Sequence, residues 1–266
     1  MNKENLFIHS SKHGKFLICN GEESIQKALI ENGEFEPLGV RLAIEFAEHK
    51  TGKIIDVGAN IGVFTIPVAN HFKEKKIIAV EPQKMVFMHL CSNILLNELM
   101  NVNVLKVAVA DLDETNGLIQ VPIFNIFFEK YTGSVSLDNE TQKIRGSINS
   151  VAEPSIWASE HEYVNVSTLD LLCGNDDISF IKIDVEGMEL KVIRTGETMI
   201  SSQKPFIYFE SWTLSEFADM RAELLGYVIS LGYKIIEIGE DCFAFHPEVI
   251  EDNIVRSKFS KLGLIV

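Results

Sequence analysis

Lys53–Glu81, KIIDVGANIGVFTIPVANHFKEKKIIAVE, is the stretch that decides the fold. Residues 53–57 form a short apolar, β-branched run, which is the pattern of a buried parallel strand. A glycine turn, residues 58–62, follows at once and leads into a segment with helical spacing. Residues 77–80 are a second buried-type strand, and Glu81 closes it. A strand, a turn, a helix and a strand in this order predict an α/β domain with a parallel sheet.

The glycine turn is the first candidate for a ligand site. Gly58 and Gly62 allow the backbone to turn sharply and a ligand to lie against it without a Cβ in the way. Ligands of open α/β sheets bind at the carboxyl ends of the strands, near the first crossover. We therefore expect a nucleotide-like ligand here, with its ribose hydroxyls on Glu81. The alternative is an ordinary strand–helix turn in a structural domain.

The sequence of the turn, Asp56-x-Gly58-x-Asn60-x-Gly62, indicates the kind of nucleotide. A dinucleotide site needs G-x-G-x-x-G, whose close glycine pair admits a pyrophosphate. Here Asn60 breaks that pair, the turn has no lysine or arginine, and Asp56 adds negative charge. A pyrophosphate would therefore meet a poor electrostatic fit in this turn. A cationic ligand would not meet this difficulty. With the acid at the end of the second strand, the pattern resembles the S-adenosylmethionine site of class I methyltransferases.

The second informative stretch is 178–189, ISFIKIDVEGME. Residues 178–183 read as a strand, which Asp184 closes before the turn into the next helix. Placed beside the first strand, Asp184 would point into the same crevice as Gly58. The alternative is that Asp184 and Glu186 cap the following helix, which is favourable at a helix N-terminus. Both descriptions can hold at once.

This stretch also carries a family resemblance. F-I-K-I-D-V-E-G-M-E-L-K-V-I-R-T-G, followed by K-P-F-I-Y-F-E, resembles the FkbM-type methyltransferases, which carry K-x-D-x-E-G-x-E after the D-x-G-A-N-x-G turn and the E-P strand end. The match covers roughly residues 53–212, and the combination of motifs is much more specific than the turn alone. The matching residues are Asp56, Gly58, Ala59, Asn60, Gly62, Glu81, Pro82, Lys182, Asp184, Glu186, Gly187, Glu189 and Glu210.

The resemblance implies an S-adenosyl-L-methionine-dependent methyltransferase of the class I fold, often acting on hydroxyl groups of sugars or secondary metabolites. An alcohol acceptor must lose its proton as it attacks the methyl group, and carboxylates can take it. We expect the catalytic carboxylates to be Asp184, Glu186 and Glu210, with Glu186 or Asp184 nearest the acceptor hydroxyl. The expected cofactor-binding residues are Asp56, Gly58, Ala59, Asn60, Gly62, Glu81, Pro82, Asp111 and Asp184. We expect no metal, although a divalent ion held by the same carboxylates is an alternative way to activate the acceptor.

Asp111 follows an expected third strand over 102–109, whose valines are its apolar members. In a doubly wound sheet this edge faces the adenine side of the crevice, where the carboxylate could accept the adenine amino group. The alternative is a turn residue before Asp113-Glu114.

The expected architecture is a doubly wound, Rossmann-like methyltransferase sheet over residues 51–266, mostly parallel with an antiparallel edge hairpin. Residues 1–50 are an N-terminal extension with a hairpin and a helix. An insertion at about 112–170 is a candidate lid or acceptor-binding wall, because long insertions are often functional. A surface elaboration or an oligomer contact is the alternative.

Composition restricts the partners. The chain has 266 residues and a formal net charge of −14, which argues against nucleic acid and against anionic membranes. The 4 cysteines are far apart in the sequence, which indicates reduced thiols rather than disulfides or a zinc site. We therefore expect a soluble, cytoplasmic protein. We expect a small-molecule or glycan acceptor and a possible homo-oligomer. The rival functions are an NAD(P)-dependent oxidoreductase and a non-catalytic binding domain.

Overall fold

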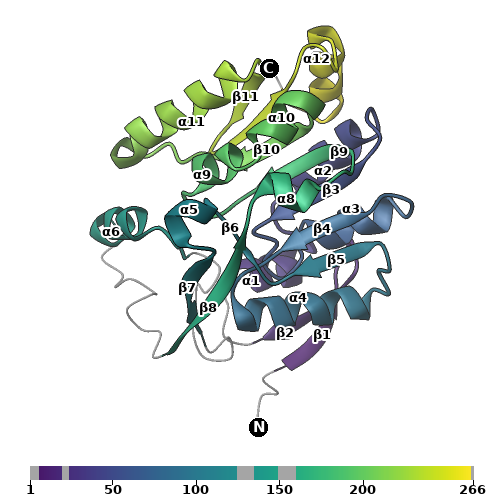
Figure 1. The fold of residues 1–266 in the computed structure, drawn as a ribbon. Helices are drawn as coiled ribbons and strands as arrows, with labels where there is room; N and C mark the ends of the chain where they lie inside the picture. Colours follow the sequence, from purple (N-terminus) through teal and green to yellow (C-terminus); the bar gives the residue numbers. More distant parts are fainter. Residues whose placement is uncertain (1–5, 20–23, 125–134, 149–159, 265–266) are drawn as a thin grey trace.

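A central twisted sheet carries the site (Figure 1). The computed structural model describes residues 6–19, 24–124, 135–148 and 160–264. The sheet is 7-stranded with the order β11-β12-β10-β9-β3-β4-β5. β12 runs antiparallel to both of its neighbours, and the other pairs are parallel. This confirms the doubly wound sheet with an antiparallel edge hairpin. Its strands are β3 (Lys53–Val57), β4 (Ile77–Val80), β5 (Val102–Leu105), β9 (Ile178–Ile183), β10 (Phe206–Glu210), β11 (Lys234–Ile238) and β12 (Asp241–Phe245).

Alternation along the strands produces two apolar cores, one on each face of the sheet. Ile54 and Phe180 point to one face, and Ile55 and Ile181 point to the other. The first face is covered by α1 (Ser24–Asn32), α2 (Pro37–Ala47), α3 (Thr65–His71), α4 (Lys84–Leu96) and α12 (Asp252–Lys261). The second is covered by α8 (Leu169–Cys173), α9 (Glu189–Arg194), α10 (Glu197–Gln203) and α11 (Ala218–Ser230).

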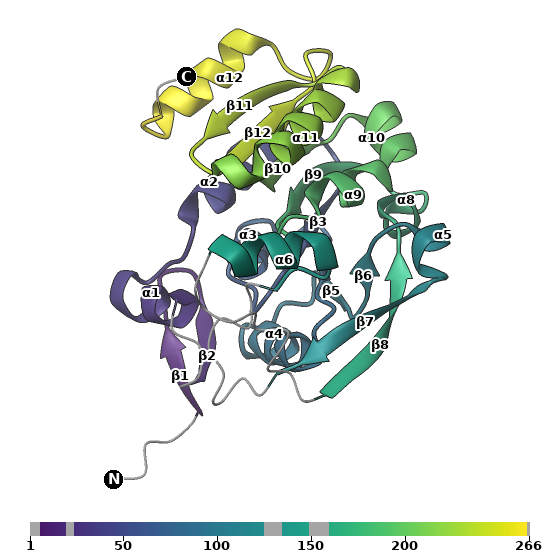
Figure 2. The same cartoon turned by 90° about the vertical axis from the view of Figure 1, so that its left-hand side faces the viewer.

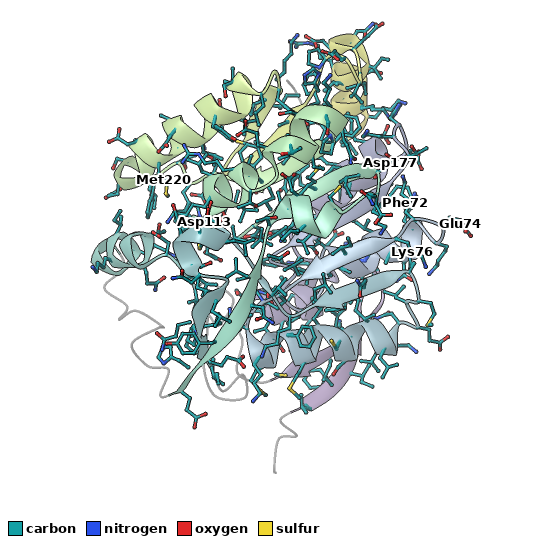
Figure 3. The ribbon with its side chains drawn as sticks, in the orientation of Figure 1. Phe72, Glu74, Lys76, Asp113, Asp177 and Met220 are labelled. Atoms are coloured by element: carbon teal, nitrogen blue, oxygen red, sulfur yellow. The ribbon has the colours of Figure 1, made fainter. Side chains whose placement is uncertain are left out.

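The parallel strands all start at the same edge of the sheet. In Figure 3, Lys76 and Asp177, which directly precede β4 and β9, lie at that edge, and Asp113 lies on the far side. The carboxyl ends of the strands therefore gather at the opposite edge, which is where this fold binds ligands.

The expected strand over 102–109 is wrong, because the structure divides it in two. β5 ends at Leu105, and β6 (Ala108–Val109) joins a separate 3-stranded sheet of order β6-β8-β7. Glu81 N–H still donates to Leu105 O, but the N–H of Gln83 donates to the Glu81 carboxylate instead of continuing the ladder. The remaining elements of this region are α5 (Leu112–Thr115), β7 (Leu118–Ile123), α6 (Asn139–Ile148) and β8 (Glu160–Ser167).

An N-terminal hairpin, β1 (Leu6–Ser10) and β2 (Lys15–Cys19), forms as expected and packs against α4. Asn93 of α4 accepts from Leu17 N–H at 2.7 Å and donates to Ile61 O at 2.8 Å. This buried amide thus joins the hairpin, the helix and the glycine turn. In the described part of the chain, no helix has the length and hydrophobicity needed to cross a bilayer.

Candidate functional site

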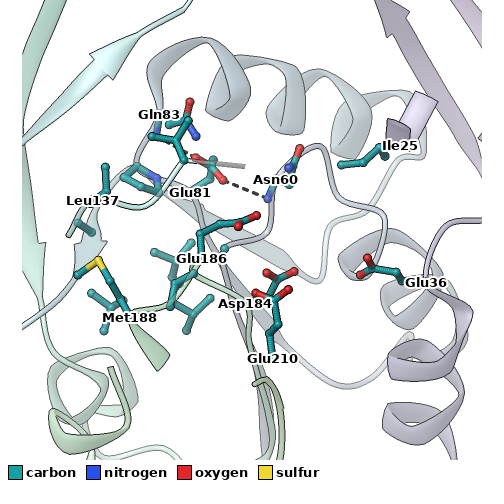
Figure 4. Close-up of a pocket in the computed structure, with 18 of the residues that line it drawn as sticks. Ile25, Glu36, Asn60, Glu81, Gln83, Leu137, Asp184, Glu186, Met188 and Glu210 are labelled. Carbon is teal, nitrogen blue, oxygen red and sulfur yellow. Dashed lines mark hydrogen bonds between the residues drawn. The ribbon is translucent and has the colours of Figure 1, made fainter. Parts of the chain in front are cut away.

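A cavity of about 380 Å³ opens at the carboxyl ends of β3, β4, β9 and β10. Its volume is within the range of small-molecule sites. In Figure 4, Glu81 and Asn60 lie at one end, and Asp184, Glu186 and Glu210 gather next to them. Of the candidate residues, the lining contains Gly58, Asn60, Glu81, Pro82, Asp184, Glu186 and Glu210.

The glycine turn is shaped by its neighbour β9. Gly58 has φ 78°, and a Cβ on it would lie 1.8 Å from the carbonyl oxygen of Asp184. No other residue type fits here, because any side chain would collide with the backbone. Asn60 has φ 48°, a left-handed conformation that asparagine tolerates better than most residues. The close approach of β9 therefore requires glycine at position 58, and Gly58 and Asn60 of the turn both line the cavity.

Glu81 is fixed against the turn. Its Oε2 accepts from Asn60 N–H at 3.1 Å, and its Oε1 accepts from Gln83 N–H at 2.9 Å. The side chain is only 4% exposed, and burial raises its pKa to about 7, while the two backbone hydrogen bonds oppose that shift. Each carboxylate oxygen has a second lone pair. Glu81 can thus accept a ligand hydroxyl from the orientation it already has.

Asp56 and Lys182 lie beneath the turn. Asp56 is fully buried, accepts from Thr65 Oγ1 at 2.5 Å and lies 3.4 Å from Lys182 Nζ. Burial raises the pKa of Asp56, and the Lys182 ammonium opposes this shift. Lys182 Nζ also donates to Gly58 O at 2.9 Å and pairs with Asp184 at 3.0 Å. Burial disfavours its charge, but the carboxylates of Asp184 and Asp56 outweigh burial and raise its pKa.

Glu210 lies at the end of β10 in the same cavity. Burial raises its pKa to about 10, and the charges of Asp184 and Glu186 add to the effect. Its Oε2 is buried and has no hydrogen-bond partner among the described residues. A protonated Glu210 can donate a hydrogen bond at neutral pH, which an ionised carboxylate cannot do.

Glu186 lies in the turn after β9 with φ 57°, a left-handed conformation that is unusual for glutamate. Its Oε2 accepts from Arg145 Nη1 at 2.5 Å, and the Arg145 guanidinium lies 4.8 Å from the centre of the Trp212 ring. Burial raises the pKa of Glu186 to about 7, and Arg145 opposes that shift. A Cβ on the next residue, Gly187, would lie 2.6 Å from Thr141 Cγ2.

Glu189, the last acid of the K-x-D-x-E-G-x-E motif, holds the backbone of the turn. Its Oε1 accepts from the backbone N–H groups of Val185 and Gly187 at 3.0 and 3.2 Å. Burial raises the pKa of Glu189 to about 7. The side chain therefore fixes the turn that carries Glu186, and it does not line the cavity.

Four of the expected cofactor residues lie outside the lining. Asp111 is exposed and caps α5 by accepting from Asp113 N–H and Glu114 N–H at 2.8 and 3.0 Å, so its placement matches the turn-residue alternative. Gly62 has φ 95° and packs against Leu90 and Ile66. The four are Asp56, Ala59, Gly62 and Asp111.

The sequence reasoning missed several lining residues. Glu36 precedes Pro37 at the start of α2, and burial raises its pKa to about 7. Asp241 follows the turn between β11 and β12, where burial raises its pKa. Their only signal was an acid beside an element boundary, and Arg145 and Trp212 gave none. Among the residues with described positions, no group of three or more could hold a metal ion.

Comparison with known proteins identifies the family. The methyltransferase FkbM domain matches residues 56–235. Methyltransferase sdnD of Sordaria araneosa is 26% identical over 154 residues, which are 53% of this chain and 59% of that protein. A tRNA(Phe) (4-demethylwyosine(37)-C(7)) aminocarboxypropyltransferase of Methanocaldococcus jannaschii is 33% identical over 84 residues, 32% of each chain. The chain thus spans less than two thirds of the length of both curated relatives.

Solved structures resemble it more distantly. A methyltransferase FkbM from Methylobacillus flagellatus KT has 18% identity and a TM-score of 0.47, over 74% of this chain and 44% of that one. M. jannaschii TYW2 in complex with AdoMet has 16% identity and a TM-score of 0.42, over 92% of this chain and 85% of that one. The domain match confirms the family that the two motifs resembled: the chain belongs to the methyltransferase FkbM family, whose cofactor is S-adenosyl-L-methionine.

Proposed function

We propose that this chain transfers a methyl group from S-adenosyl-L-methionine to a hydroxyl group of a sugar or small metabolite. The observation that carries the proposal is that one cavity contains both sets of groups the reaction needs. Gly58, Asn60 and Glu81 lie at one end, and Asp184, Glu186 and Glu210 lie beside them.

The residues present fit the cofactor. Gly58 and Asn60 line the cavity at the turn, and the φ of 78° at Gly58 gives the turn the shape against which the adenosyl group would lie. The buried Glu81 carboxylate offers acceptor lone pairs to ribose hydroxyls. Asp184 adds a carboxylate to the cavity lining, which would suit a ligand that carries a sulfonium and an ammonium. We assign Gly58, Asn60, Glu81, Pro82 and Asp184 to cofactor binding.

The acceptor end supports proton transfer. When bound, S-adenosyl-L-methionine supplies a methyl group on a sulfonium, so no leaving anion needs stabilisation. Glu186 takes the proton of the acceptor hydroxyl as the oxygen attacks, a contribution of typically about 10²–10⁴-fold in rate. With a pKa raised to about 7 by burial, Glu186 can hold that proton better than an exposed carboxylate. Glu210, protonated at neutral pH, donates a hydrogen bond that orients the acceptor.

Two other functions fit less well. In an NAD(P) site, the N–H of Asn60 would face a pyrophosphate, but here it donates to the Glu81 carboxylate. One curated relative is named for a tRNA substrate. A net charge of −14 favours a small acceptor over a polyanion.

The test is a transfer reaction with methyl-labelled S-adenosyl-L-methionine, the full chain and small-molecule extracts, read by mass spectrometry. We expect label in hydroxyl-bearing small molecules. Label found only in RNA would overturn the acceptor class, and no label with normal cofactor binding would leave the binding-domain alternative standing.

Two variants assign the roles. Glu81→Ala should weaken binding of S-adenosyl-L-homocysteine roughly 10- to 100-fold, because it removes charge-assisted hydrogen bonds. Glu186→Gln should leave binding within about 2-fold and slow turnover by about 10²–10⁴-fold. Calorimetry and initial rates measure the two effects, and the opposite pattern would exchange the roles.

A further inference from the structure

Helix α6 reaches the cavity from the segment between β7 and β8. Figure 2 shows it lying across the edge of the sheet where the strands end. Asp138 caps the helix by accepting from Thr141 N–H at 2.9 Å and from Thr141 Oγ1 at 2.8 Å. Its other oxygen, Oδ1, pairs with Lys191 of α9 at 2.6 Å. The start of α6 is thus attached to the helix that follows the Glu186 turn.

Arg145, in the last turn of α6, is in contact with two parts of the cavity wall. Its Nη1 lies 2.5 Å from Glu186 Oε2, and its guanidinium lies 4.8 Å from the centre of the Trp212 ring. The side chains of Arg145 and Glu186 are each 20% exposed, so water screens the pair only partly. A planar guanidinium can donate to a carboxylate and stack on an aromatic ring at the same time, which an ammonium does less well.

We propose that Arg145 is a positioning residue for Glu186: stacked on Trp212, it holds the Glu186 carboxylate at the cavity wall, with Oε2 bound and Oε1 directed to the acceptor. This inference rests on the proposed role of Glu186 as the base. It also gives α6 a defined part in the reaction, as the source of a residue that completes the acceptor site.

The ionised side chain of Glu186 needs a cationic partner, because burial and the surrounding carboxyl groups both oppose its ionisation. The backbone at this position is already held, since Glu189 accepts from the N–H groups of Val185 and Gly187. The charged and titratable groups that face Glu186 are Arg145 of α6, Lys182 and Asp184 at the end of β9, Glu210 of β10 and Glu36 before α2.

The chain contains a matched control. Arg194 Nη2 lies 2.8 Å from Glu223 Oε1, and its guanidinium lies 5.3 Å from the centre of the Tyr227 ring. This is the same combination of ion pair and ring contact, placed away from the cavity. Arg194→Met should therefore leave rates and pH profiles as they are in the unmodified protein.

The first experiment measures rates of methyl transfer against pH, with the acceptor found in the labelled screen. Arg145→Met should lower kcat about 10- to 100-fold at pH 7 and leave cofactor affinity within 2-fold. The acidic limb of the pH–rate profile of Arg145→Met should move up by about 1–3 pH units, because a nearby cation no longer favours the ionised carboxylate of Glu186. Arg145→Lys keeps a positive charge, so its acidic limb should move less than that of Arg145→Met.

The second experiment needs no acceptor. Carbon-13 NMR of protein labelled at the glutamate carboxyl groups follows the titration of Glu186, whose resonance is assigned by its loss in Glu186→Gln. Arg145→Met should move that titration upward by about 1–3 pH units, and Arg194→Met should not move it. An unchanged Glu186 titration in Arg145→Met overturns the proposal.

The two measurements separate this proposal from the proposed function. If Glu186→Gln keeps a normal rate, Glu186 is not the base, and the NMR titration still shows whether Arg145 acts on it. If Glu186→Gln is slow but Arg145→Met has normal kinetics, the function stands and the positioning role is wrong. Equal losses at every pH in Arg145→Met and Arg145→Lys, with an unshifted titration, would show a purely structural role.

Discussion

At the scale of the residue, Gly58 determines how closely two strands approach under the ligand site. The carbonyl of Asp184 occupies the place where a side chain would begin, 1.8 Å from a hypothetical Cβ. The same carbonyl belongs to the residue whose carboxylate faces the cavity. The glycine turn and Asp184 are therefore placed by the same close contact between backbones.

Gly58→Ala should destabilise the protein by about 2–5 kcal/mol, because the new Cβ forces the two strands apart at a positive φ. Gly226→Ala is the matched control: Gly226 is an exposed position of α11 with no atom within 4 Å of its hypothetical Cβ. That substitution should stabilise the protein by about 0.5–1 kcal/mol. Urea unfolding measures both, and similar effects from the two variants would contradict the argument.

Motif residues could be predicted from the sequence, and contact partners could not. Gly58, Glu81 and Asp184 reach the cavity because strand ends fix their positions. Asp111 also follows a strand, yet its carboxylate caps α5 and does not line the cavity. Arg145 lies on a helix with no motif, and its meeting with Glu186 depends on how distant segments pack.

At the scale of the element, β9 holds the site together through Lys182. Its ammonium donates to Gly58 O after β3 and pairs with Asp56 within β3 and with Asp184 at its own end. Three groups from two neighbouring strands thus depend on one side chain that is 9% exposed.

Lys182→Met should destabilise the protein by about 3–5 kcal/mol, because it leaves the buried Asp56 carboxylate without its ion pair. S-adenosyl-L-homocysteine affinity should also fall as the turn loosens. Lys53→Met, which removes the more exposed pair with Asp176 on the same sheet, should change stability by no more than about 1 kcal/mol. Thermal melts and calorimetry check both variants. Equal effects would mean that the Lys182 contacts add little.

Element boundaries depended on tertiary contacts. The valines of 102–109 predict one strand, but β5 and β6 join different sheets. Lys106, between them, pairs with Glu162 of β8 at 2.7 Å. No local pattern in the sequence predicts this ion pair. The mostly parallel sheet, in contrast, could be predicted from the alternation of buried strands and helices, which the sequence shows directly.

At the scale of the whole molecule, buried carboxyl groups link stability to pH. Burial raises the pKa of Glu36, Glu81, Glu186 and Glu189 to about 7 and that of Glu210 to about 10, from an ordinary value of 4.5. Between pH 5 and 8 the folded protein therefore retains protons that the unfolded chain has released. Raising the pH across this window favours the unfolded chain.

The Tm of the ligand-free protein should accordingly fall from pH 5 to pH 8. Each retained proton weakens stability by about 1.4 kcal/mol per pH unit, and about 1 kcal/mol corresponds to roughly 2–4 °C in a chain of this size. Calorimetric melts at constant ionic strength measure the slope. Glu210→Gln removes the group with the largest shift, so its Tm should fall less steeply. A Tm that is constant or rises would contradict this account.

The hydrogen bonds that hold Glu81 have a thermodynamic consequence. Asn60 and Gln83 already fix both carboxylate oxygens, at 3.1 and 2.9 Å. Immobilising a free side chain on binding costs about 0.5–1.5 kcal/mol in lost rotamer entropy. For Glu81 that entropy is lost during folding, so a ligand hydroxyl meets a preorganised acceptor and binding does not have to immobilise this side chain.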